Sequence, residues 1–332
     1  MKLGDLIRFG RRRRVGSSAS GSTGIIDTRV GGVRFYLSYM AKDKPALAGM
    51  ILVALFLVWA LIEDIMQQLA GYLNDPSFAW RLLPSNPNAL YFQDKLLPPS
   101  LNNFPNYIMG TNYQGQSIFS QVLFAAPHDA VASILIVASA ILIGMLLGTT
   151  AGFLGGWTDE AIMRITDAFL SLPGLVLAIT ISVILGVSGT SGFVDVLLAL
   201  SIIWWPTYAR FFRAQALGIR NTAYVESARL SGSGRMRILF RHIIPNSIDP
   251  IVAYATLDFG TVILTYAALA FLGIGLDLNY PEWGAISSLG LGYFPVDWWW
   301  SLMPGLVITV VVVAFTLVGD RLQDLVVGRM TY

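Results

Sequence analysis

The sequence of 332 residues contains no cysteine and only two histidines, His128 and His242. Disulfides, thiolate metal ligands and cysteine nucleophiles are therefore excluded, and a histidine-based metal site is not expected. Charged residues are also scarce, at 13% of the chain against about 25% in an average soluble domain. With 55% of its residues hydrophobic, the chain has too few charged side chains for an ordinary soluble surface, which indicates that lipid surrounds much of it.

Motifs that carry catalysis are absent as well. The sequence has no G-x-x-x-x-G-K-[ST] loop to hold nucleotide phosphates, no H-E-x-x-H zinc motif and no G-x-S-x-G nucleophile elbow. We therefore expect a protein that is not an enzyme and that binds no metal or cofactor itself. Nothing in the sequence favours nucleic acid as a partner.

Long apolar runs are what the sequence has in abundance. A run of about 17–25 apolar residues can cross a bilayer as a helix, and inside hydrocarbon a helix satisfies its own backbone hydrogen bonds. The sequence therefore predicts an all-α polytopic membrane protein with six transmembrane helices. The six candidate spans are residues 46–62, 130–154, 168–187, 192–212, 247–276 and 301–319.

The positions of Lys and Arg predict the orientation, because cytoplasmic loops carry the excess of positive charge. With a cytoplasmic N-terminus, 20 of the 22 basic residues fall in cytoplasmic segments, and only Arg81 and Lys95 fall outside. The cytoplasmic segments then include a turn near Arg164 and the loop 210–245. We expect a multi-pass protein of the cell membrane, in contact with lipid, with both termini in the cytoplasm.

Charge and hydropathy together predict five parts. The N-terminal part is a basic tail that ends in an amphipathic helix on the inner leaflet. The extracytoplasmic part is rich in Pro, Asn and aromatic residues, and the core contains a basic cytoplasmic loop, 213–246. The predicted parts are 1–45 (tail), 46–66 (first transmembrane helix), 67–126 (extracytoplasmic loop region), 127–322 (five-helix core) and 323–332 (cytoplasmic tail).

Asp258 is the most deeply placed carboxylate of the predicted spans. It lies about 13 residues into the fifth span, or roughly 19 Å at 1.5 Å per residue. An Asp at the centre of a membrane helix costs roughly 2.5–3.5 kcal/mol, so its side chain should face protein or water. Two interpretations are open. Asp258 and Tyr266 line a translocation pathway, or Asp258 accepts an interhelical hydrogen bond from a Thr or Tyr.

The loop between the fourth and fifth spans contains seven arginines between residues 210 and 245. Apolar residues recur at helical spacing up to Leu230, Gly232 and Gly234 then interrupt the helix, and a second amphipathic helix follows with Met236 on its apolar face. Pro245 is expected to open the fifth span. A helix–Gly turn–helix unit suits a docking lever, although a solvated basic loop would show the same arginines.

This loop resembles the EAA loop of ABC importer permeases, in which Glu-Ala-Ala is followed after three residues by Gly and later by an Ile-Leu-Pro-like ending. The string 241–246, RHIIPN, is similar to the dipeptide and oligopeptide branch in particular. Residues 107–325 carry further matches in the same order, among them MGTN (109–112), GFLGGW (152–157), PEWG (281–284) and GD (319–320). The chain thus resembles the C-type permease subunit of peptide importers, which has the type I ABC importer permease fold.

The resemblance implies a permease that forms half of a translocation pathway for di- or oligopeptides, or alternatively for oligosaccharides. It implies a second homologous permease, two cytoplasmic ATPases that bind ATP and Mg²⁺, and an extracytoplasmic binding protein. Glu226 would contact an ATPase, and Arg229 and Arg235 would pair with acidic residues of its groove. The matching residues are Glu226, Ser227, Ala228, Arg229, Gly232 and Arg235 in the coupling loop, and Arg241, His242, Pro245 and Asn246 at its end.

Three departures from the family pattern stand out. Ser227 replaces the usual middle Ala, Gly115-Gln116-Ser117 stands where Gly-Arg-Asp is usual, and Asp258 replaces a small residue. The last two bear on the substrate rather than on the coupling machinery. Two other classes of protein remain as alternatives: a proton-coupled secondary carrier that works through Asp258, and a structural or receptor-like protein whose basic loop recruits a partner.

Overall fold

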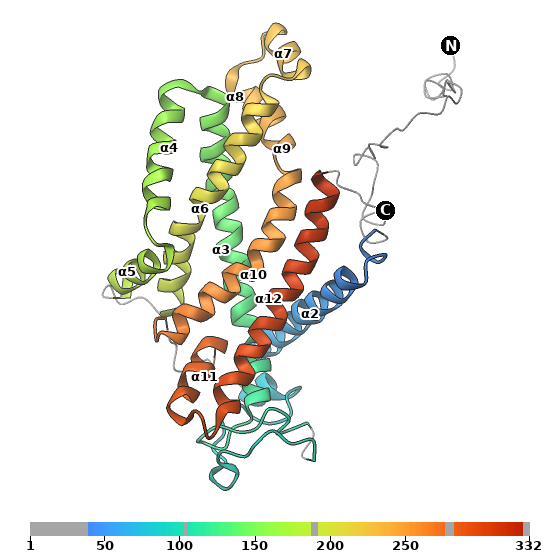
Figure 1. Cartoon of the computed structure of the whole chain (residues 1–332), viewed down its shortest axis with the longest axis vertical. Helices are drawn as coiled ribbons and strands as arrows, with labels where there is room; N and C mark the ends of the chain where they lie inside the picture. Colours follow the sequence, from blue (N-terminus) through green and yellow to red (C-terminus); the bar gives the residue numbers. More distant parts are fainter. Residues whose placement is uncertain (1–38, 103–104, 187–191, 276–281, 328–332) are drawn as a thin grey trace, which may run out of the picture.

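The computed structural model of the chain describes residues 39–102, 105–186, 192–275 and 282–327. Most of these residues are helical. The long helices α3 (Ile118–Leu154), α6 (Gly192–Ile219) and α12 (Trp298–Val327) run mainly along the long axis of the molecule, whereas α2 (Lys44–Leu73) crosses it obliquely (Figure 1). We call the end that carries α7 (Ala223–Leu230) the loop end. The opposite end, with α11 (Trp283–Gly290) and residues 74–117, is the cap end.

Five helices of the described chain are long and apolar enough to cross a membrane. A further pair, α4 (Gly156–Ser171) and α5 (Gly174–Gly186), counts as a sixth span only if its two members are taken together. The predicted all-α membrane fold is thereby confirmed, with five or six spans. The five are α2 (Lys44–Leu73), α3 (Ile118–Leu154), α6 (Gly192–Ile219), α10 (Asp249–Phe271) and α12 (Trp298–Val327).

The first two membrane helices are longer than predicted. α2 continues to Leu73, past the predicted end of the span at 62 and of the first-helix part at 66. α3 begins at Ile118, before the predicted start of the span at 130 and of the core at 127. Polar residues ended the predicted first span, but Gln67 continues the helix and donates a hydrogen bond to the carbonyl oxygen of Phe124 on α3, at 2.9 Å. The segment between these helices is therefore 74–117, with 3₁₀ turns at Pro76–Trp80 and Phe92–Asp94.

The predicted third span, 168–187, is not a single helix. α4 and α5 meet at an angle of 94°. Leu172 between them is extended, with φ −90° and ψ 144°, as the residue before a proline prefers. The expected turn near Arg164 is instead part of α4. The uncharged run concealed this break, because apolar composition carries no information about helix direction.

Other predicted boundaries shift at the ends of elements. α10 begins at Asp249, with Pro250 in its first turn, so Pro245 does not open the fifth span. α12 continues to Val327, past the predicted end of the core at 322. Most of the predicted tail and amphipathic helix within 1–45 lies outside the described residues.

α3 and α6 make the most extensive helix–helix contact of the described chain, along glycines that recur every fourth residue of α3. A Cβ on Gly148 would lie 2.2 Å from the carbonyl oxygen of Ala209, and a Cβ on Gly152 would lie 2.6 Å from that of Arg213. Gly144 faces α6 in the same way. Small residues at such positions let two membrane helices approach closely, so this glycine row fixes the spacing of the central pair.

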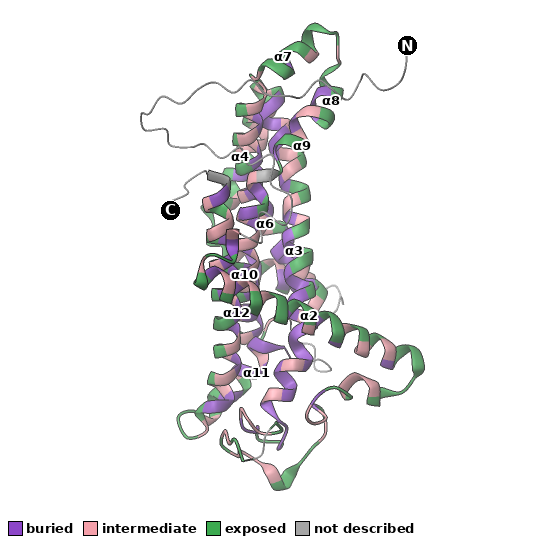
Figure 2. Cartoon of the chain, turned by 90° about the vertical axis from the view of Figure 1, so that its right-hand side faces the viewer, coloured by how far each residue is buried: buried purple, intermediate pink, exposed green. Residues whose placement is uncertain are grey.

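Buried apolar side chains form three clusters: at the cap end, in the middle and at the loop end. The cap-end cluster joins α2 to the other helices through Phe56 and Trp283, whose ring centroids lie 5.5 Å apart. Much of α2 is exposed (Figure 2). Its exposed residues include Leu55 and Leu61, each about three-fifths exposed. An outer surface of this kind suits contact with lipid.

Candidate functional site

Residues 213–219 continue α6, past the predicted end of the fourth span at 212, and the remainder of the predicted 213–246 loop lies beyond the end of that helix (Figure 1). Its elements confirm the predicted helix–Gly turn–helix, with the second helix divided into short pieces. They are α7 (Ala223–Leu230), α8 (Arg235–Ile238), the π-helical turn Leu239–Ile243 and α9 (Ile244–Asn246).

One face of this loop is anchored in the loop-end cluster. Val225, Leu239 and Ile243 are almost completely buried there, against Phe153 of α3 and Ala216 of α6. A cluster of interlocking apolar side chains resists local rearrangement. The loop is therefore packed as one body with the central helix pair.

The opposite face is exposed and partly apolar. Leu230 is 84% exposed and Met236 is 61% exposed, although both belong to the apolar positions that helical spacing indicated. The turn carries both residues away from the loop-end cluster that anchors the rest of the loop. The exposed apolar tip is a feature that periodicity could not reveal, since periodicity does not show what lies opposite a helix face.

Gly232 forms the turn as predicted. Its φ is +77°, and its N–H donates to the Arg229 carbonyl at 3.0 Å, while the Ser233 N–H donates to the Ala228 carbonyl at 3.1 Å. This pair of bonds is the Schellman motif that ends many helices with a left-handed glycine. A Cβ on Gly232 would meet no atom within 4 Å, so conformation alone requires glycine here.

The predicted coupling residues Glu226, Ser227, Arg229 and Arg235 are exposed, and Ala228 is half-buried. The Arg229 guanidinium lies over the ring of Phe153, 5.7 Å from its centroid. Arg229 and Arg235 line the same pocket, of about 390 Å³, together with Phe153, Leu154, Ser233 and Ile238. The structure thus brings the two predicted arginines together at one positively charged hollow.

The predicted residues at the end of the loop lie on the π-helical turn and α9. The Asn246 side-chain amide donates to the His242 carbonyl at 2.7 Å, and the His242 ring lies 6.3 Å from that of Tyr224 on α7. Arg241 and Pro245 are exposed. These contacts place the end of the loop beside its first helix.

Three of the seven arginines between residues 210 and 245 bind to groups on other helices, which the sequence did not indicate. Arg213 makes a two-pronged ion pair with Asp159 of α4, at 2.5 and 2.7 Å, and Arg210 pairs with Asp167 at 2.6 Å. Arg220 donates to the carbonyl oxygen of Gly152 at 3.0 Å. These partners lie far away in sequence, so no local pattern shows them.

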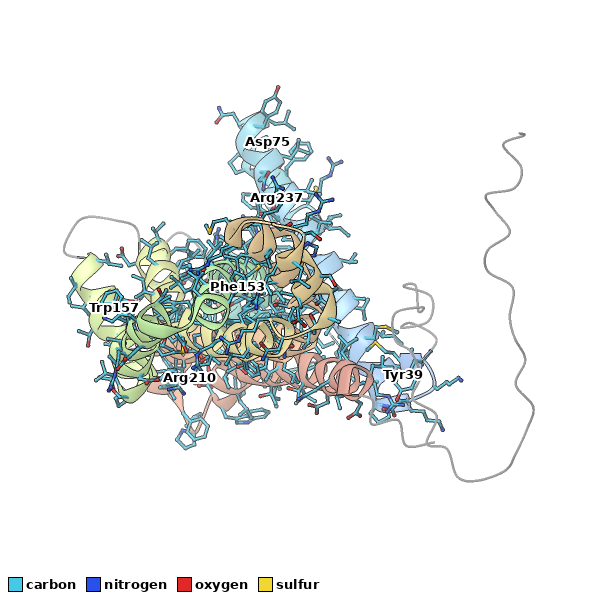
Figure 3. The ribbon with its side chains drawn as sticks, turned by 90° about the horizontal axis from the view of Figure 1, so that it is seen from above. Tyr39, Asp75, Phe153, Trp157, Arg210 and Arg237 are labelled. Atoms are coloured by element: carbon cyan, nitrogen blue, oxygen red, sulfur yellow. The ribbon has the colours of Figure 1, made fainter. Side chains whose placement is uncertain are left out.

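The other four arginines form no ion pair with any described residue. They are Arg229, Arg235, Arg237 and Arg241. Seen from the loop end, Phe153 lies over the middle of the bundle, whereas Arg237 and Trp157 lie toward two different edges (Figure 3). Positive charge that has no ion-pair partner in the described part of the chain is therefore concentrated on the loop.

Asp258 faces protein, as its depth predicted. Its Oδ2 accepts hydrogen bonds from Trp204 Nε1 at 2.6 Å and Tyr208 Oη at 2.9 Å, both on α6. This is the interhelical hydrogen bond of the second interpretation, with a tryptophan added. The spacing of Trp204 and Tyr208 could have indicated these two donors, because residues four apart share one helix face. Tyr266 is also buried, with its ring 6.3 Å from that of Phe193.

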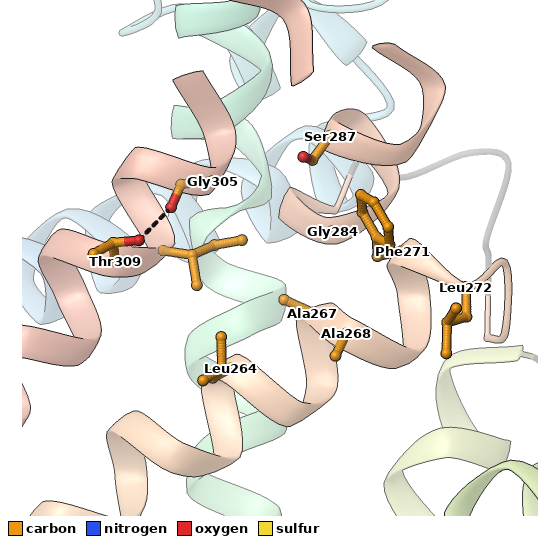
Figure 4. Close-up of a pocket in the computed structure, with 10 residues that line it drawn as sticks. Leu264, Ala267, Ala268, Phe271, Leu272, Gly284, Ser287, Gly305 and Thr309 are labelled. Carbon is orange, nitrogen blue, oxygen red and sulfur yellow. Dashed lines mark hydrogen bonds between the residues drawn. The ribbon is translucent and has the colours of Figure 1, made fainter. Parts of the chain in front are cut away.

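An apolar groove of about 370 Å³ lies between α10, α11 and α12 (Figure 4). Its two hydroxyl groups donate to backbone carbonyls, Ser287 to Ser301 and Thr309 to Gly305. Asp258 and Tyr266 are not among the residues that line it. The lining residues are Leu264, Ala267, Ala268, Phe271, Leu272, Gly284, Ser287, Gly305, Ile308 and Thr309.

At the cap end, the departure Gly115-Gln116-Ser117 is part of a buried neutral network. Gln116 Oε1 accepts hydrogen bonds from the side chains of Asn112 and Gln121, both at 2.8 Å. Nearby, Trp299 at the start of α12 donates to the Thr111 carbonyl at 3.2 Å. Residues 74–117 are thereby attached to the helical bundle by polar contacts as well as apolar ones.

Together these features define the class of the protein. It is a helical membrane protein whose distinctive parts are a polar cap, an apolar groove and an anchored loop with an exposed basic face. The sequence matches the family described as "Binding-protein-dependent transport system inner membrane component" over residues 140–332. The chain belongs to this family. It is a multi-pass permease component of an ABC importer in the cell membrane, and it is non-catalytic because the ATPase is a separate subunit.

Individual relatives agree with this assignment. The chain is 38% identical to a probable D,D-dipeptide transport system permease of Escherichia coli (strain K12), over 74% of this chain and 79% of that protein. It is 33% identical to a dipeptide transport system permease of Alkalihalophilus pseudofirmus, over 88% of each. A glutathione transport system permease of Pectobacterium atrosepticum is 37% identical, over 68% of this chain and 74% of that protein.

Proposed function

We propose that this chain forms half of a translocation pathway for di- or oligopeptides. The observation that carries the proposal is the similarity to permeases named for D,D-dipeptides, dipeptides and glutathione, all of which contain amide-linked amino acids. None of these three relatives is named for a sugar, so peptides are favoured over oligosaccharides. A secondary carrier driven through Asp258 is disfavoured, because both hydrogen bonds to that carboxyl come from this chain's own α6.

The 213–246 loop, in this proposal, lies in the cytoplasm and docks on an ATPase, with both termini on the same side. Its exposed Leu230 and Met236 supply an apolar centre, and Glu226, Arg229 and Arg235 supply a charged rim. An apolar centre with a polar rim is the usual anatomy of a protein interface. Arginines without internal partners would pair with acidic side chains of the ATPase groove.

The proposal also assigns positions to the ATPases, the second permease and the binding protein. Two ATPases would bind ATP and Mg²⁺, while this chain binds neither. A second permease would contact the groove between α10 and α12, where Gly305, Ala267 and Ala268 let a helix approach closely. The extracytoplasmic binding protein would deliver its ligand to the cap, residues 74–117.

Uptake by the reconstituted importer tests this function. Proteoliposomes would contain this chain, the second permease and both ATPases, with ATP inside and the binding protein outside. We expect ATP-dependent uptake of a labelled dipeptide or tetrapeptide that persists when the proton gradient is collapsed. Uptake of a trisaccharide but no peptide would contradict the substrate, and uptake driven by a proton gradient without ATP would contradict the mechanism.

Site-directed crosslinking tests the docking of the loop. The chain contains no cysteine, so Ser231→Cys next to the turn is the only thiol in that variant. In the assembled importer we expect a thiol–amine crosslinker to join it to an ATPase. Ser77→Cys, exposed at the cap end, is the matched control and should give no such product. Equal products from both positions would show that the loop is not the docking element.

A further inference from the structure

Two buried carboxyl groups meet at the cap end of the bundle. Asp129 lies on α3, and Glu282 is the residue that caps the N-terminus of α11. Asp129 has no exposed surface, and Glu282 is 8% exposed. The two carboxyl groups are close enough to interact electrostatically, although no hydrogen bond joins them in this structure. They come from distant parts of the sequence, and neither has a place in the proposed coupling or transport path.

These carboxyl groups lack donors. Both oxygens of Asp129 and Oε1 of Glu282 have no hydrogen-bond partner among the described residues, while Glu282 Oε2 accepts the Ala285 N–H at 3.0 Å. The backbone N–H groups of Trp283 and Gly284 are near enough to favour the ionised forms, but no described Lys, Arg or His forms an ion pair with either residue.

Two ionised carboxylates in contact repel, and burial penalises each charge further. A pair that shares one proton avoids both costs, because the protonated group donates its O–H to the other carboxylate. The three oxygens without donors are therefore explained if the pair binds a cation. A proton is the smallest cation that could join two carboxyl groups lying this close together, and it needs no further ligands.

The start of α11 has little freedom to relieve such repulsion by moving. Trp283 is 1% exposed and donates its indole N–H to the Val122 carbonyl of α3 at 2.8 Å. A Cβ on Gly284 would lie 1.9 Å from the carbonyl oxygen of Ala267 on α10. Gly284 also lines the apolar groove, so the position of α11 determines the shape of that groove.

We propose that Asp129 and Glu282 form a proton-binding site that holds the start of α11 against α3, and that loss of the proton loosens this contact. Burial raises the pKa of Glu282 from 4.5 to about 7. Because this pKa is raised, the stabilisation is complete below about pH 4.5 and is lost as the pH rises through about 7.

The pH-dependent effects of other titratable groups near the cap end must be distinguished from the effect of the Asp129–Glu282 pair. They are His128 beside Asp129 on α3, Tyr266 on α10, Asp297 just before α12 and Glu63 on α2. Histidine titrates close to the same pH range, with an ordinary pKa of about 6.5. His128→Gln and Glu63→Gln are therefore the controls, and the pH dependence that remains in both is the part assigned to the Asp129–Glu282 pair.

The test is the thermal unfolding of the purified full-length chain in lipid nanodiscs, followed by tryptophan fluorescence between about pH 5 and pH 9. We expect the Tm of the natural chain to fall by several degrees as the pH rises through about 7. Asp129→Asn and Glu282→Gln should abolish this dependence, because an amide donates to the remaining carboxylate at every pH. Transport activity is not needed for this measurement.

Infrared spectroscopy of the natural chain supplies a readout that does not depend on any variant folding. We expect a protonated-carboxyl C=O band that disappears over the same pH range. A Tm that is constant or rises with pH, or a fall that persists in both amide variants, would overturn the proposal. Restoration of the Tm at high pH by Na⁺ or Ca²⁺ in the natural chain alone would identify a metal-cation site instead, and would overturn it as well.

Discussion

At the scale of single residues, Gly232 is required for its backbone conformation only. A non-glycine residue at φ +77° pays roughly 1–2 kcal/mol, whereas Asn tolerates this region better. We expect Gly232→Ala to reduce substrate-stimulated ATPase activity more than Gly232→Asn, and Gly232→Trp to abolish coupling, all with normal membrane insertion. Gly234→Ala is the control, because Gly234 has φ −64° and open space around it. Normal activity in Gly232→Trp would show that this turn is dispensable.

Asp258 illustrates a residue whose depth was predictable and whose partners were not. We expect Asp258→Asn to keep ATP-driven peptide uptake within about twofold, because its amide oxygen still accepts from Trp204 or Tyr208. Asp258→Leu leaves both donors without an acceptor and should destabilise the chain by about 1–3 kcal/mol. Uptake and Tm measured together separate the two roles. Loss of uptake in Asp258→Asn with an unchanged Tm would restore the pathway interpretation.

At the scale of secondary-structure elements, the contact between α3 and α6 depends on glycine. A Cβ on Gly148 would lie 2.2 Å from a backbone oxygen of α6, and backbone cannot rotate away as a side chain can. We expect Gly148→Ala to destabilise the chain by about 1–3 kcal/mol through overpacking, seen as a lower Tm and a lower yield of folded protein. Gly218→Ala on α6, where a Cβ meets nothing within 4 Å, should be neutral. Equal Tm values for the two variants would contradict close packing here.

The elements also show why sequence reasoning succeeds and fails in this molecule. Hydropathy located the long spans, since burial in lipid requires a continuous apolar stretch, and glycine chemistry located the turn at Gly232. The bend before Pro173 was missed because the apolar run outweighed a single local signal. The Arg213–Asp159 and Asp129–Glu282 pairs were missed for another reason: tertiary packing creates them, and a sequence without its fold does not show which helices touch.

At the scale of the whole molecule, the three apolar clusters divide the bundle along its length. The loop-end cluster joins the docking loop to α3 and α6, and those two helices run on to the middle cluster that surrounds Tyr208. Ion pairs from α6 to α4 extend the same body sideways. A displacement of α7 should therefore move these helices together rather than bend the loop alone.

This arrangement predicts that docking and coupling can be separated. Leu239 is 2% exposed in the loop-end cluster, and Leu239→Ala should cost about 2–5 kcal/mol locally by leaving a cavity. The exposed tip that would meet the ATPase is unchanged. We therefore expect the crosslink from Ser231→Cys to form normally while peptide uptake per ATP hydrolysed falls, because a less tightly packed cluster transmits less of the movement to the helices.

The control is Leu142→Ala, which makes the same deletion at a side chain that is 56% exposed on the outside of α3. It should leave both measurements unchanged. If Leu239→Ala lost the crosslink and uptake in parallel, the cluster would serve docking itself, and the rigid connection from loop to helix pair would not be the route of coupling.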